Sequence, residues 1–405
     1  MSEWKKVKLG EICEIYAGGD KPKIFSEHKT NKCCIPVYSN GIDNEGLYGF
    51  TNIAKNKGNA ITITGRGANA GTVFYRKTPF LPIIRLLTLN PNNKVIDPQY
   101  LYYLLKEKTF LSTGSAQPQI TVPNIAQYEI EYTPKIATQH CIATILSRYD
   151  SLIENYQKQI KLLEEAAQRL YKEWFVDLHF PGHENTKIVD GVPEGWEKNA
   201  FGSVIDYEIG GGWGSDTKTT NEIIPAYVIR GTDMSTLDMG IWKELPYRFH
   251  QESNYRARQL MHNDIIFEVS GGSKNEGVAK TFLVQQELLD KLDNHVICAS
   301  FCKLIRLKDS SIAYYIYDTL KEWRASGITA QYDKRSASSI VNYRWKDFLS
   351  QQEILIPNEI VLRDYIKKSE LIHSSITKKS SQIRLLTEAR DRLLPKLMSG
   401  EIDAQ

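Results

Sequence analysis

Between residues 139 and 174, apolar residues recur at a spacing of seven, and this pattern limits the possible folds more than any other feature. Two interleaved series make it up: Ile142, Tyr149, Tyr156, Leu163 and Leu170, and Leu146, Ile153, Ile160, Ala167 and Trp174. Such series form the a and d seam of a coiled coil, and no Gly or Pro interrupts them. We therefore predict one continuous helix about 50 Å long, whose seam needs a helical partner.

A second copy of this pattern lies 223 positions further along the chain. Gln159-Ile160 matches Gln382-Ile383, and Arg169-Leu170 matches Arg392-Leu393. The seam of the second copy comprises Tyr365, Ile372, Ile376, Ile383, Leu386, Leu393 and Leu397. Three polar residues interrupt this seam, namely Ser369, Lys379 and Arg390, so we expect the second helix to be the weaker one alone. Asn358 is its predicted N-cap, and Pro395 is expected to end its regular part at about Leu394.

The segment before each helix mixes short strands with helices. In the first segment we predict strands at residues 35–38, 60–64, 72–75, 82–89 and 128–132 and a helix at residues 98–106. The second segment repeats its landmarks, since Trp4, Gly10 and Gly18-Gly19 have the same spacing as Trp196, Gly202 and Gly210-Gly211. We therefore predict an α+β chain with an internal pseudo-two-fold repeat: two mixed α/β domains separated by a long antiparallel two-helix coiled coil.

Composition excludes some classes of protein. Hydrophobic residues make up 41% and charged residues 24% of the 405, as in soluble globular proteins. No apolar run approaches a membrane span and no signal peptide is visible, so we expect a cytoplasmic protein without membrane contact. The six cysteines form no CxxC pair, and we expect buried thiols rather than metal ligands. The net charge of +3 is too small to indicate nucleic-acid binding, which would need a local basic face.

Several stretches resemble the specificity subunits of type I restriction-modification systems. The strongest are Glu165-Ala-Ala-Gln-Arg-Leu-Tyr-Lys-Glu-Trp-Phe-Val-Asp-Leu-His-Phe-Pro-Gly and Leu385-Leu-Thr-Glu-Ala-Arg-Asp-Arg-Leu-Leu-Pro-Lys-Leu-Met-Ser-Gly-Glu-Ile-Asp, which are similar to the family's two spacer regions. The loop Gly114-Ser-Ala-Gln-Pro-Gln-Ile-Thr and the two Trp–Gly landmarks are similar to those of its target recognition domains. The resemblance covers essentially the whole chain, and the duplicated order makes it specific.

The resemblance implies a division of labour. Target recognition domains at residues 1–135 and 181–357 would each recognise one half of a bipartite double-stranded DNA target. The spacer helices, at residues 136–180 and 358–405, would set the gap. Two modification subunits would dock there and use S-adenosylmethionine for adenine N6 methylation, and motor-nuclease subunits using ATP and Mg would restrict DNA. This chain itself would be non-catalytic and hold no cofactor.

Missing motifs agree with a non-catalytic role. None of the fifteen prolines is followed by Pro or Asp, which argues against an adenine methyltransferase and a typical nuclease, and there is no GxxxxGK[ST] loop. His179 and His183 flank Pro181-Gly182, so we interpret them as surface or packing residues.

Two alternatives remain open: a stand-alone nuclease or methyltransferase, and a homodimeric coiled-coil scaffold without a DNA role. Tyr149, Tyr156 and Trp174 could also form a docking surface instead of the seam.

Base recognition needs side chains with paired donors or acceptors on loops that differ between the copies. In the first domain the candidates are Lys21, Lys23, Ser39, Asn40, Arg66, Asn69, Gln117 and Gln119. In the second they are Trp213, Arg230, Lys274, Asn275, Gln331, Lys334 and Arg335. Each of them could instead be a solvated loop side chain, and the Arg and Lys residues could contact phosphates without specifying sequence.

Overall fold

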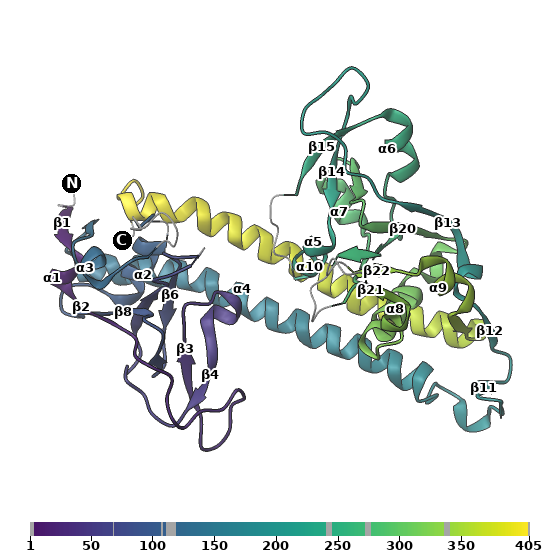
Figure 1. Cartoon of the computed structure of the whole chain (residues 1–405), viewed down its shortest axis with the longest axis horizontal. Coiled ribbons are helices and arrows are strands. Elements are labelled where there is room, and N and C mark those ends of the chain that lie inside the picture. Colours follow the sequence, from purple (N-terminus) through teal and green to yellow (C-terminus); the bar gives the residue numbers. More distant parts are fainter. Residues whose placement is uncertain are drawn as a thin grey trace. The chain divides into compact units, whose positions relative to one another are not determined.

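The computed structural model describes residues 4–67, 69–106, 108–110, 119–239, 245–271, 277–335 and 341–403, with the side chain of Arg335 left aside (Figure 1). The chain forms two compact units. Unit 1 comprises Met1–Ser151 and Thr387–Gln405, and unit 2 comprises Leu152–Leu386. Two long helices contribute to both units: α4 (Ile136–Tyr171) and α10 (Glu359–Ser399). No helix in the described ranges is long and apolar enough to cross a membrane.

Unit 1 contains a mixed domain built on two small sheets. Its strands are β1 (Lys5–Lys8), β2 (Cys13–Ala17), β3 (Ile35–Tyr38), β4 (Leu47–Thr51), β5 (Ala60–Ile63), β6 (Val73–Arg76), β7 (Leu81–Pro82), β8 (Leu87–Pro91) and β9 (Glu129–Tyr132). Its helical elements are α1 (Leu9–Ile12), η1 (Asp43–Gly46), α2 (Pro98–Lys106) and α3 (Val122–Ala126). One sheet has the order β2-β8-β5-β6 and the other β4-β3-β7, while β1 pairs with β9.

Unit 2 contains the second mixed domain. Its strands are β10 (Ile188–Val189), β11 (Val192–Pro193), β12 (Glu197–Ala200), β13 (Ile205–Gly210), β14 (Ile224–Ile229), β15 (Tyr247–His250), β16 (Ile265–Glu268), β17 (Ser270–Gly271), β18 (Thr281–Leu283), β19 (Val296–Cys298), β20 (Cys302–Leu307), β21 (Asp333–Arg335), β22 (Val341–Tyr343) and β23 (Glu353–Ile356). Its helical elements are η2 (Lys172–Val176), η3 (His183–Asn185), η4 (Phe201–Val204), α5 (Gly231–Asp238), α6 (Glu252–Arg258), α7 (Gln286–Lys291), η5 (Ser310–Ile312), α8 (Ala313–Ala325), η6 (Thr329–Tyr332) and α9 (Trp345–Gln351).

The two mixed domains share one topology, as the repeated landmarks predict. The sheet β13-β20-β16-β18 of the second domain matches β2-β8-β5-β6 of the first. The sheet β15-β14-β19 matches β4-β3-β7, and in both the central strand pairs antiparallel to one neighbour and parallel to the other. The pair β12-β23 matches β1-β9. The internal repeat is therefore a repeat of strand order as well as of sequence landmarks.

Each repeated glycine pair contains one glycine that the fold requires. A Cβ on Gly18 would lie 2.7 Å from the backbone nitrogen of Ile83, and a Cβ on Gly211 would lie 2.2 Å from the carbonyl oxygen of Ala299. Gly18 follows β2, and its nitrogen donates to the carbonyl of Leu86 just before β8. Gly211 follows β13, and its nitrogen donates to the carbonyl of Cys302 in β20. A bulge between Ile205 and Tyr207 explains why Gly211, and not Gly210, is equivalent to Gly18.

The long helices pack through the predicted seam in each unit. In unit 2 the buried residues Ile153, Ile160, Ile376 and Ile383 form a cluster of their own. The helices run antiparallel there, because Tyr156 lies beside Lys379 while Trp174 lies beside Tyr365. In unit 1 Leu146 and Leu394 belong to the core of the first mixed domain. All predicted seam residues are buried or half-buried, and Trp174 is 6% exposed.

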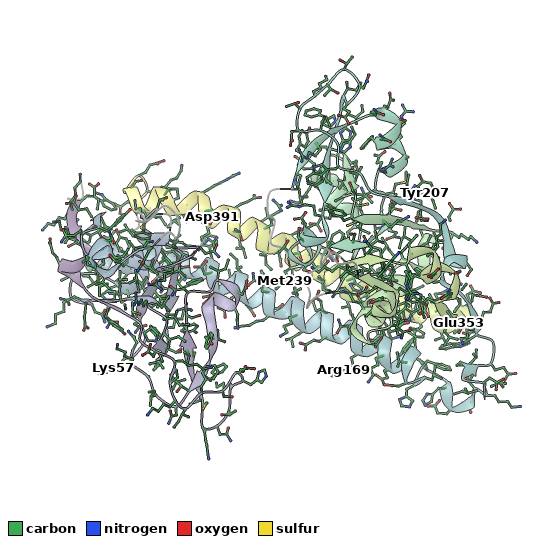
Figure 2. The ribbon with its side chains drawn as sticks, viewed as in Figure 1. Lys57, Arg169, Tyr207, Met239, Glu353 and Asp391 are labelled. Atoms are coloured by element: carbon green, nitrogen blue, oxygen red, sulfur yellow. The ribbon has the colours of Figure 1, made fainter. Side chains whose placement is uncertain are left out.

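The polar interruptions of the second helix have partners. Ser369 is fully buried and donates to a carboxylate oxygen of Asp318 on α8, with 2.6 Å between the oxygens. Arg390 donates to Asp150 on α4 at 2.6 Å and also pairs with Asp391, which Figure 2 labels. The Lys379 ammonium lies 5.4 Å from the centre of the Tyr156 ring. These residues therefore join α10 to its neighbours in the fold, and the expected weakness of the second helix when alone stays a prediction.

Two predicted boundaries were wrong. The expected strand at residues 82–89 is divided into β7 and β8, which belong to different sheets, because Ile84 and Arg85 have positive φ angles of 51° and 59° and turn the chain between them. Pro395 does not end the second helix, which continues to Ser399. Leu394 and Leu397 are both buried in the core of unit 1, and this packing offsets the roughly 3 kcal/mol that a proline costs inside a helix.

Other local predictions hold. The Asn358 side chain caps α10, since its Oδ1 accepts a hydrogen bond from the backbone nitrogen of Val361 at 3.0 Å. The helix predicted at residues 98–106 is α2, which begins at Pro98. The first long helix ends in the π-helical turn η2 before Phe180-Pro181-Gly182, and Phe180 packs on Trp196 with ring centres 4.6 Å apart.

Candidate nucleic-acid interface

In the first domain, several candidate residues gather where β5 leaves its sheet. Arg66 lies opposite Gln119 in an isolated antiparallel bridge, and the Ile120 nitrogen donates to the Gly65 carbonyl at 2.9 Å. Arg66 is exposed and Gln119 is half-buried. This bridge brings together two predicted residues that are 53 positions apart in the sequence.

The Asn40 side chain is hydrogen-bonded to the backbone next to this edge. Its Nδ2 donates to the Ile84 carbonyl at 2.5 Å, and its Oδ1 accepts from the Gly65 nitrogen at 2.8 Å. The predicted base-contacting amide of Asn40 is thus engaged with the backbone and holds the residue before Arg66 in place. Its base contact stays a prediction, and the structure gives it a positioning role.

The hairpin that carries Asn69 is tied by two threonines. The hydroxyls of Thr64 and Thr72 both donate to the Asn69 carbonyl, the latter at 2.9 Å. The Asn69 side chain itself is exposed. The backbone is therefore fixed while the side chain faces solvent, which suits a contact residue.

Lys21, Lys23 and Ser39 lie on other loops of the first domain. The Lys21 ammonium lies 3.7 Å from the centre of the Phe25 ring and 5.2 Å from that of Tyr48, and this cation–π contact orients an exposed charge. Lys23 is exposed as well. The Ser39 nitrogen donates to the Gly46 carbonyl at 2.9 Å, which closes the loop after β3.

In the second domain the corresponding edge is a three-stranded sheet of β17, β22 and β21. Ser270 and Lys334 lie on either side of Asn342. The Ser270 hydroxyl donates to the Oδ1 of Asn342 at 3.1 Å, and both Asn342 and Lys334 are exposed. Asn342 was not among the predicted residues; the signal that finds it is its register, because it lies opposite Ser270 as Gln119 lies opposite Arg66.

Arg230 and Trp213 are engaged with neighbours in unit 2. Arg230 donates from its Nε and an Nη atom to the two carboxylate oxygens of Asp233, each at 2.8 Å. These hydrogen bonds raise the pKa of Arg230, and the pair caps α5. The Arg248 guanidinium carbon lies 4.4 Å from the centre of the Trp213 ring and Arg248 also pairs with Asp216. The DNA contacts of Arg230 and Trp213 stay predictions, and in the structure both side chains also contact neighbouring residues of unit 2.

The remaining candidates divide into two groups. Gln117, Lys274 and Asn275 lie outside the described residues. Gln331 is exposed in η6 and its carbonyl accepts from Arg344, while Arg335 ends β21.

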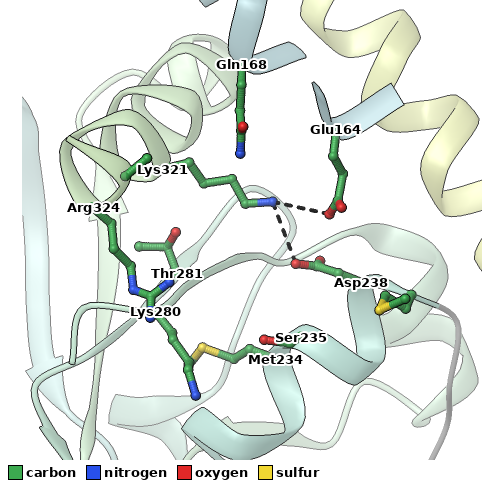
Figure 3. A pocket seen from close by; sticks show the side chains of 11 residues that line it. Glu164, Gln168, Met234, Ser235, Asp238, Lys280, Thr281, Lys321 and Arg324 are labelled. Atoms are coloured by element: carbon green, nitrogen blue, oxygen red, sulfur yellow. Dashed lines mark ion pairs between the residues drawn. The ribbon is translucent and has the colours of Figure 1, made fainter. Parts of the chain in front are cut away.

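A polar cavity in unit 2 is distinct from this interface. It has a volume of about 270 Å³ and lies between α4, α5 and α8 (Figure 3). The Lys321 ammonium lies in it, 3.6 Å from a Glu164 oxygen and 3.8 Å from an Asp238 oxygen. Burial raises the pKa of Asp238, and Lys321 offsets part of that rise. This ion-pair group joins the second mixed domain to α4, which is a structural function.

Within the described part of the chain, no three His, Cys, Asp or Glu side chains are grouped to hold a metal ion. Cys298 and Cys302 are buried, and burial raises the pKa of Cys298 to about 12 and that of Cys302 further. His179 and His183 have ring centres 5.3 Å apart, and an imidazole nitrogen of His183 lies 2.9 Å from the Phe180 carbonyl. His183 is half-buried and His179 is exposed, so the two histidines lie at the surface of unit 2.

Comparison with known proteins defines the class as DNA specificity proteins. A family described as type I restriction modification DNA specificity domain matches residues 1–165. The type I restriction enzyme MjaIX specificity subunit of Methanocaldococcus jannaschii is 27% identical over 368 residues, 84% of this chain and 77% of that protein. A putative type I specificity subunit of Mycoplasma pneumoniae, S.MpnORF289P N-terminus, is 34% identical over 147 residues, 36% of this chain and 77% of that protein.

A crystal structure supports the same fold. The S subunit of a type I restriction-modification system from M. genitalium has a TM-score of 0.62 and 16% identity, covering 98% of this chain and 96% of that one. The chain belongs to the family of type I restriction-modification specificity subunits. As a specificity subunit it has the role of DNA recognition in such a system and is not itself catalytic.

Proposed function

We propose that each mixed domain recognises one half of a bipartite DNA target and that the α4–α10 pair sets the gap between the halves. The observation that carries this proposal is the repeat of one strand order in both domains, with different exposed polar side chains at the same edge. Two domains of one topology that present different side chains suit two different half-sites. Each domain also packs on segments of both long helices.

We infer the partners by analogy with the family. Two modification subunits dock on the spacer helices and carry S-adenosylmethionine for adenine N6 methylation. Motor-nuclease subunits, which use ATP and Mg, join them to restrict DNA. A homodimeric scaffold is the competing hypothesis, and the mass of the purified chain with and without its methyltransferase separates the two: assembly of one chain with two methyltransferase subunits supports the present proposal.

Replacing residues 1–134 with the first domain of another family member is expected to change one half-site and leave the other intact. The incoming domain should keep a hydroxyl donor at position 103, because Tyr103 donates to Asp150 of α4 at 2.6 Å. Methylome sequencing of cells that express the chimera with its methyltransferase measures the outcome. Cells that lack only this chain are the control, and a change in both half-sites would contradict the proposal.

Removing one heptad from each long helix is expected to shorten the gap by up to about three base pairs and keep both half-sites, because seven helical residues span about 10 Å. Contacts of the domains limit where the cuts can fall. In unit 2 Ser381 donates to Glu287, and in unit 1 Arg390 donates to Asp150. Cuts within residues 152–163 and 382–389 preserve these contacts. Methylome sequencing again gives the motif, and an altered half-site would contradict the spacing role.

A further inference from the structure

The strand register identifies one pair of side chains that occupies the same place in both domains. Ile63 of β5 lies opposite Leu87 and Val73, and Phe267 of β16 lies opposite Lys303 and Thr281. The next residue in each copy donates to the strand across the hairpin: Thr64 to Thr72 at 3.0 Å, and Glu268 to Lys280 at 2.8 Å.

From these matched positions, the pairs follow directly. Arg66, three residues after Ile63, lies opposite Gln119, and Ser270, three residues after Phe267, lies opposite Asn342. The pairs Arg66–Gln119 and Ser270–Asn342 are therefore equivalent, and we call them the edge pairs.

The same backbone hydrogen bond closes the hairpin beside each edge pair, with a different residue as its donor in each domain. Gly71 and Ala279 occupy the same position, both with positive φ (98° and 70°), and donate to the carbonyls of Thr64 and Glu268 at 2.8 and 3.0 Å. Residues with a Cβ rarely adopt the positive φ that Ala279 has. The hairpin therefore keeps its shape in the second domain although alanine is less suited to this conformation than glycine. The repeat has thus preserved the geometry of this hairpin.

A different polar side chain lies beside the backbone of each edge pair. In the first domain the Asn40 amide supports Gly65. In the second domain the Glu268 carboxylate packs against Gly231, where a Cβ would lie 2.1 Å from its Oε1, and Glu268 is 5% exposed. Each edge pair therefore lies next to a polar side chain, which is half-buried in the first domain and buried in the second.

The edge pairs themselves differ in chemistry. Arg66 and Asn342 are exposed, and Gln119 and Ser270 are half-buried beside them. An arginine suits the two acceptors of guanine, an Asn or Gln amide suits adenine, and a serine suits either. We propose that the edge pairs are specificity-determining positions, Arg66–Gln119 for one half-site and Ser270–Asn342 for the other; this rests on the proposed function.

The test exchanges the two pairs. The double variant R66S/Q119N gives the first domain the pair of the second, and S270R/N342Q makes the reciprocal change. Methylome sequencing with the partner methyltransferase is expected to show a changed base preference in one half-site for the first variant and in the other half-site for the second. The single variants Gln119→Ala and Asn342→Ala should each lose about 10-fold or more of the discrimination at a base position in one half-site.

Matched controls are the exposed side chains Asn93 in the first domain and Gln351 in the second, whose alanine variants should keep both half-sites. Circular dichroism melting checks each variant, and Asn342→Gln replaces Asn342→Ala if the latter fails to fold. A uniform fall in methylation with unchanged base preference would overturn the proposal, because it indicates phosphate contacts alone. Unchanged methylation in all edge-pair variants would also overturn it while leaving the proposed function intact. If the wild-type chain directs no split motif, the proposed function itself fails.

Discussion

Asp318→Ala is expected to lower the free energy of unfolding of unit 2 by about 3–5 kcal/mol, which is the usual cost of removing one partner from a buried charged group. Asp318 lies on α8 and is 4% exposed. It accepts hydrogen bonds from Tyr365 at 2.7 Å and Ser369 at 2.6 Å, and one of its oxygens lies 2.8 Å from Nε2 of His373. The substitution leaves these three buried polar groups of α10 without their acceptor.

Chemical denaturation of the whole chain, followed by circular dichroism, measures this effect. Glu322→Ala is the matched control, because Glu322 lies one turn further along α8 and is only half-buried. We expect the control to change the free energy of unfolding by no more than about 0.5 kcal/mol. Equal effects of the two variants would show that Asp318 has no special part in joining α8 to α10.

The same residue predicts a pH dependence. Burial alone would raise the pKa of Asp318, but the charge of His373 and the hydrogen bonds from His373, Ser369 and Tyr365 outweigh burial and hold it below its usual value. A lowered pKa in the folded state stabilises the fold above the unfolded pKa of about 4, and this contribution is lost as the pH falls through the folded pKa. The stability difference between wild type and Asp318→Ala should therefore be full at pH 7 and shrink below about pH 4.

Gly211→Ala is the second change with a large expected effect, on the order of 3 kcal/mol of lost stability in unit 2. The added Cβ would lie 2.2 Å from the Ala299 carbonyl oxygen and 2.3 Å from that of Cys298. Both atoms belong to the backbone around β19, so they cannot rotate away as a side chain would. The sheet itself must shift to admit one methyl group.

Gly210→Ala is a control that differs by one position. Apart from Gly210 and its two chain neighbours, no atom of the described residues lies within 4 Å of a Cβ built on Gly210, so its alanine variant should be nearly neutral. The first domain offers the same comparison, with Gly18 close to Ile83 and Pro82 and Gly19 in open space. Thermal melting of the four variants gives the test; equal destabilisation by both members of a pair would show that backbone freedom, and not the close approach, is what each glycine provides.

The glycine pairs illustrate the limit of inference from sequence, because the sequence does not indicate which glycine of each pair makes the close backbone approach. The spacing of Gly18-Gly19 and Gly210-Gly211 is visible in the sequence and correctly indicated a repeat. The bulge between Ile205 and Tyr207 shifts the equivalence by one residue, so that Gly18 corresponds to Gly211. A bulge depends on pairing with β20, almost one hundred residues further along the chain, and local sequence does not determine it.

The candidate interface was predictable in the same partial way. Loop position and side-chain chemistry pointed to Arg66, Gln119 and Lys334, which lie at the two edges described above. They did not point to Asn342, and they did not distinguish Asn40, whose amide is engaged with Gly65 and Ile84. Whether an amide faces solvent or the backbone depends on a neighbour 25 or 44 residues away.

The sequence by itself determined the two long helices, their seam and the repeated order of domains, because heptad spacing and helix caps act between residues that are close along the chain. Only the tertiary structure decided that Ser369 and Arg390 have partners, that residues 82–89 divide between two sheets, and that α10 continues past Pro395. Each of these depends on contacts with α8, α4 or the core of the first domain, whose residues are distant in sequence. The free energy of such contacts exceeds the local preferences that a sequence displays.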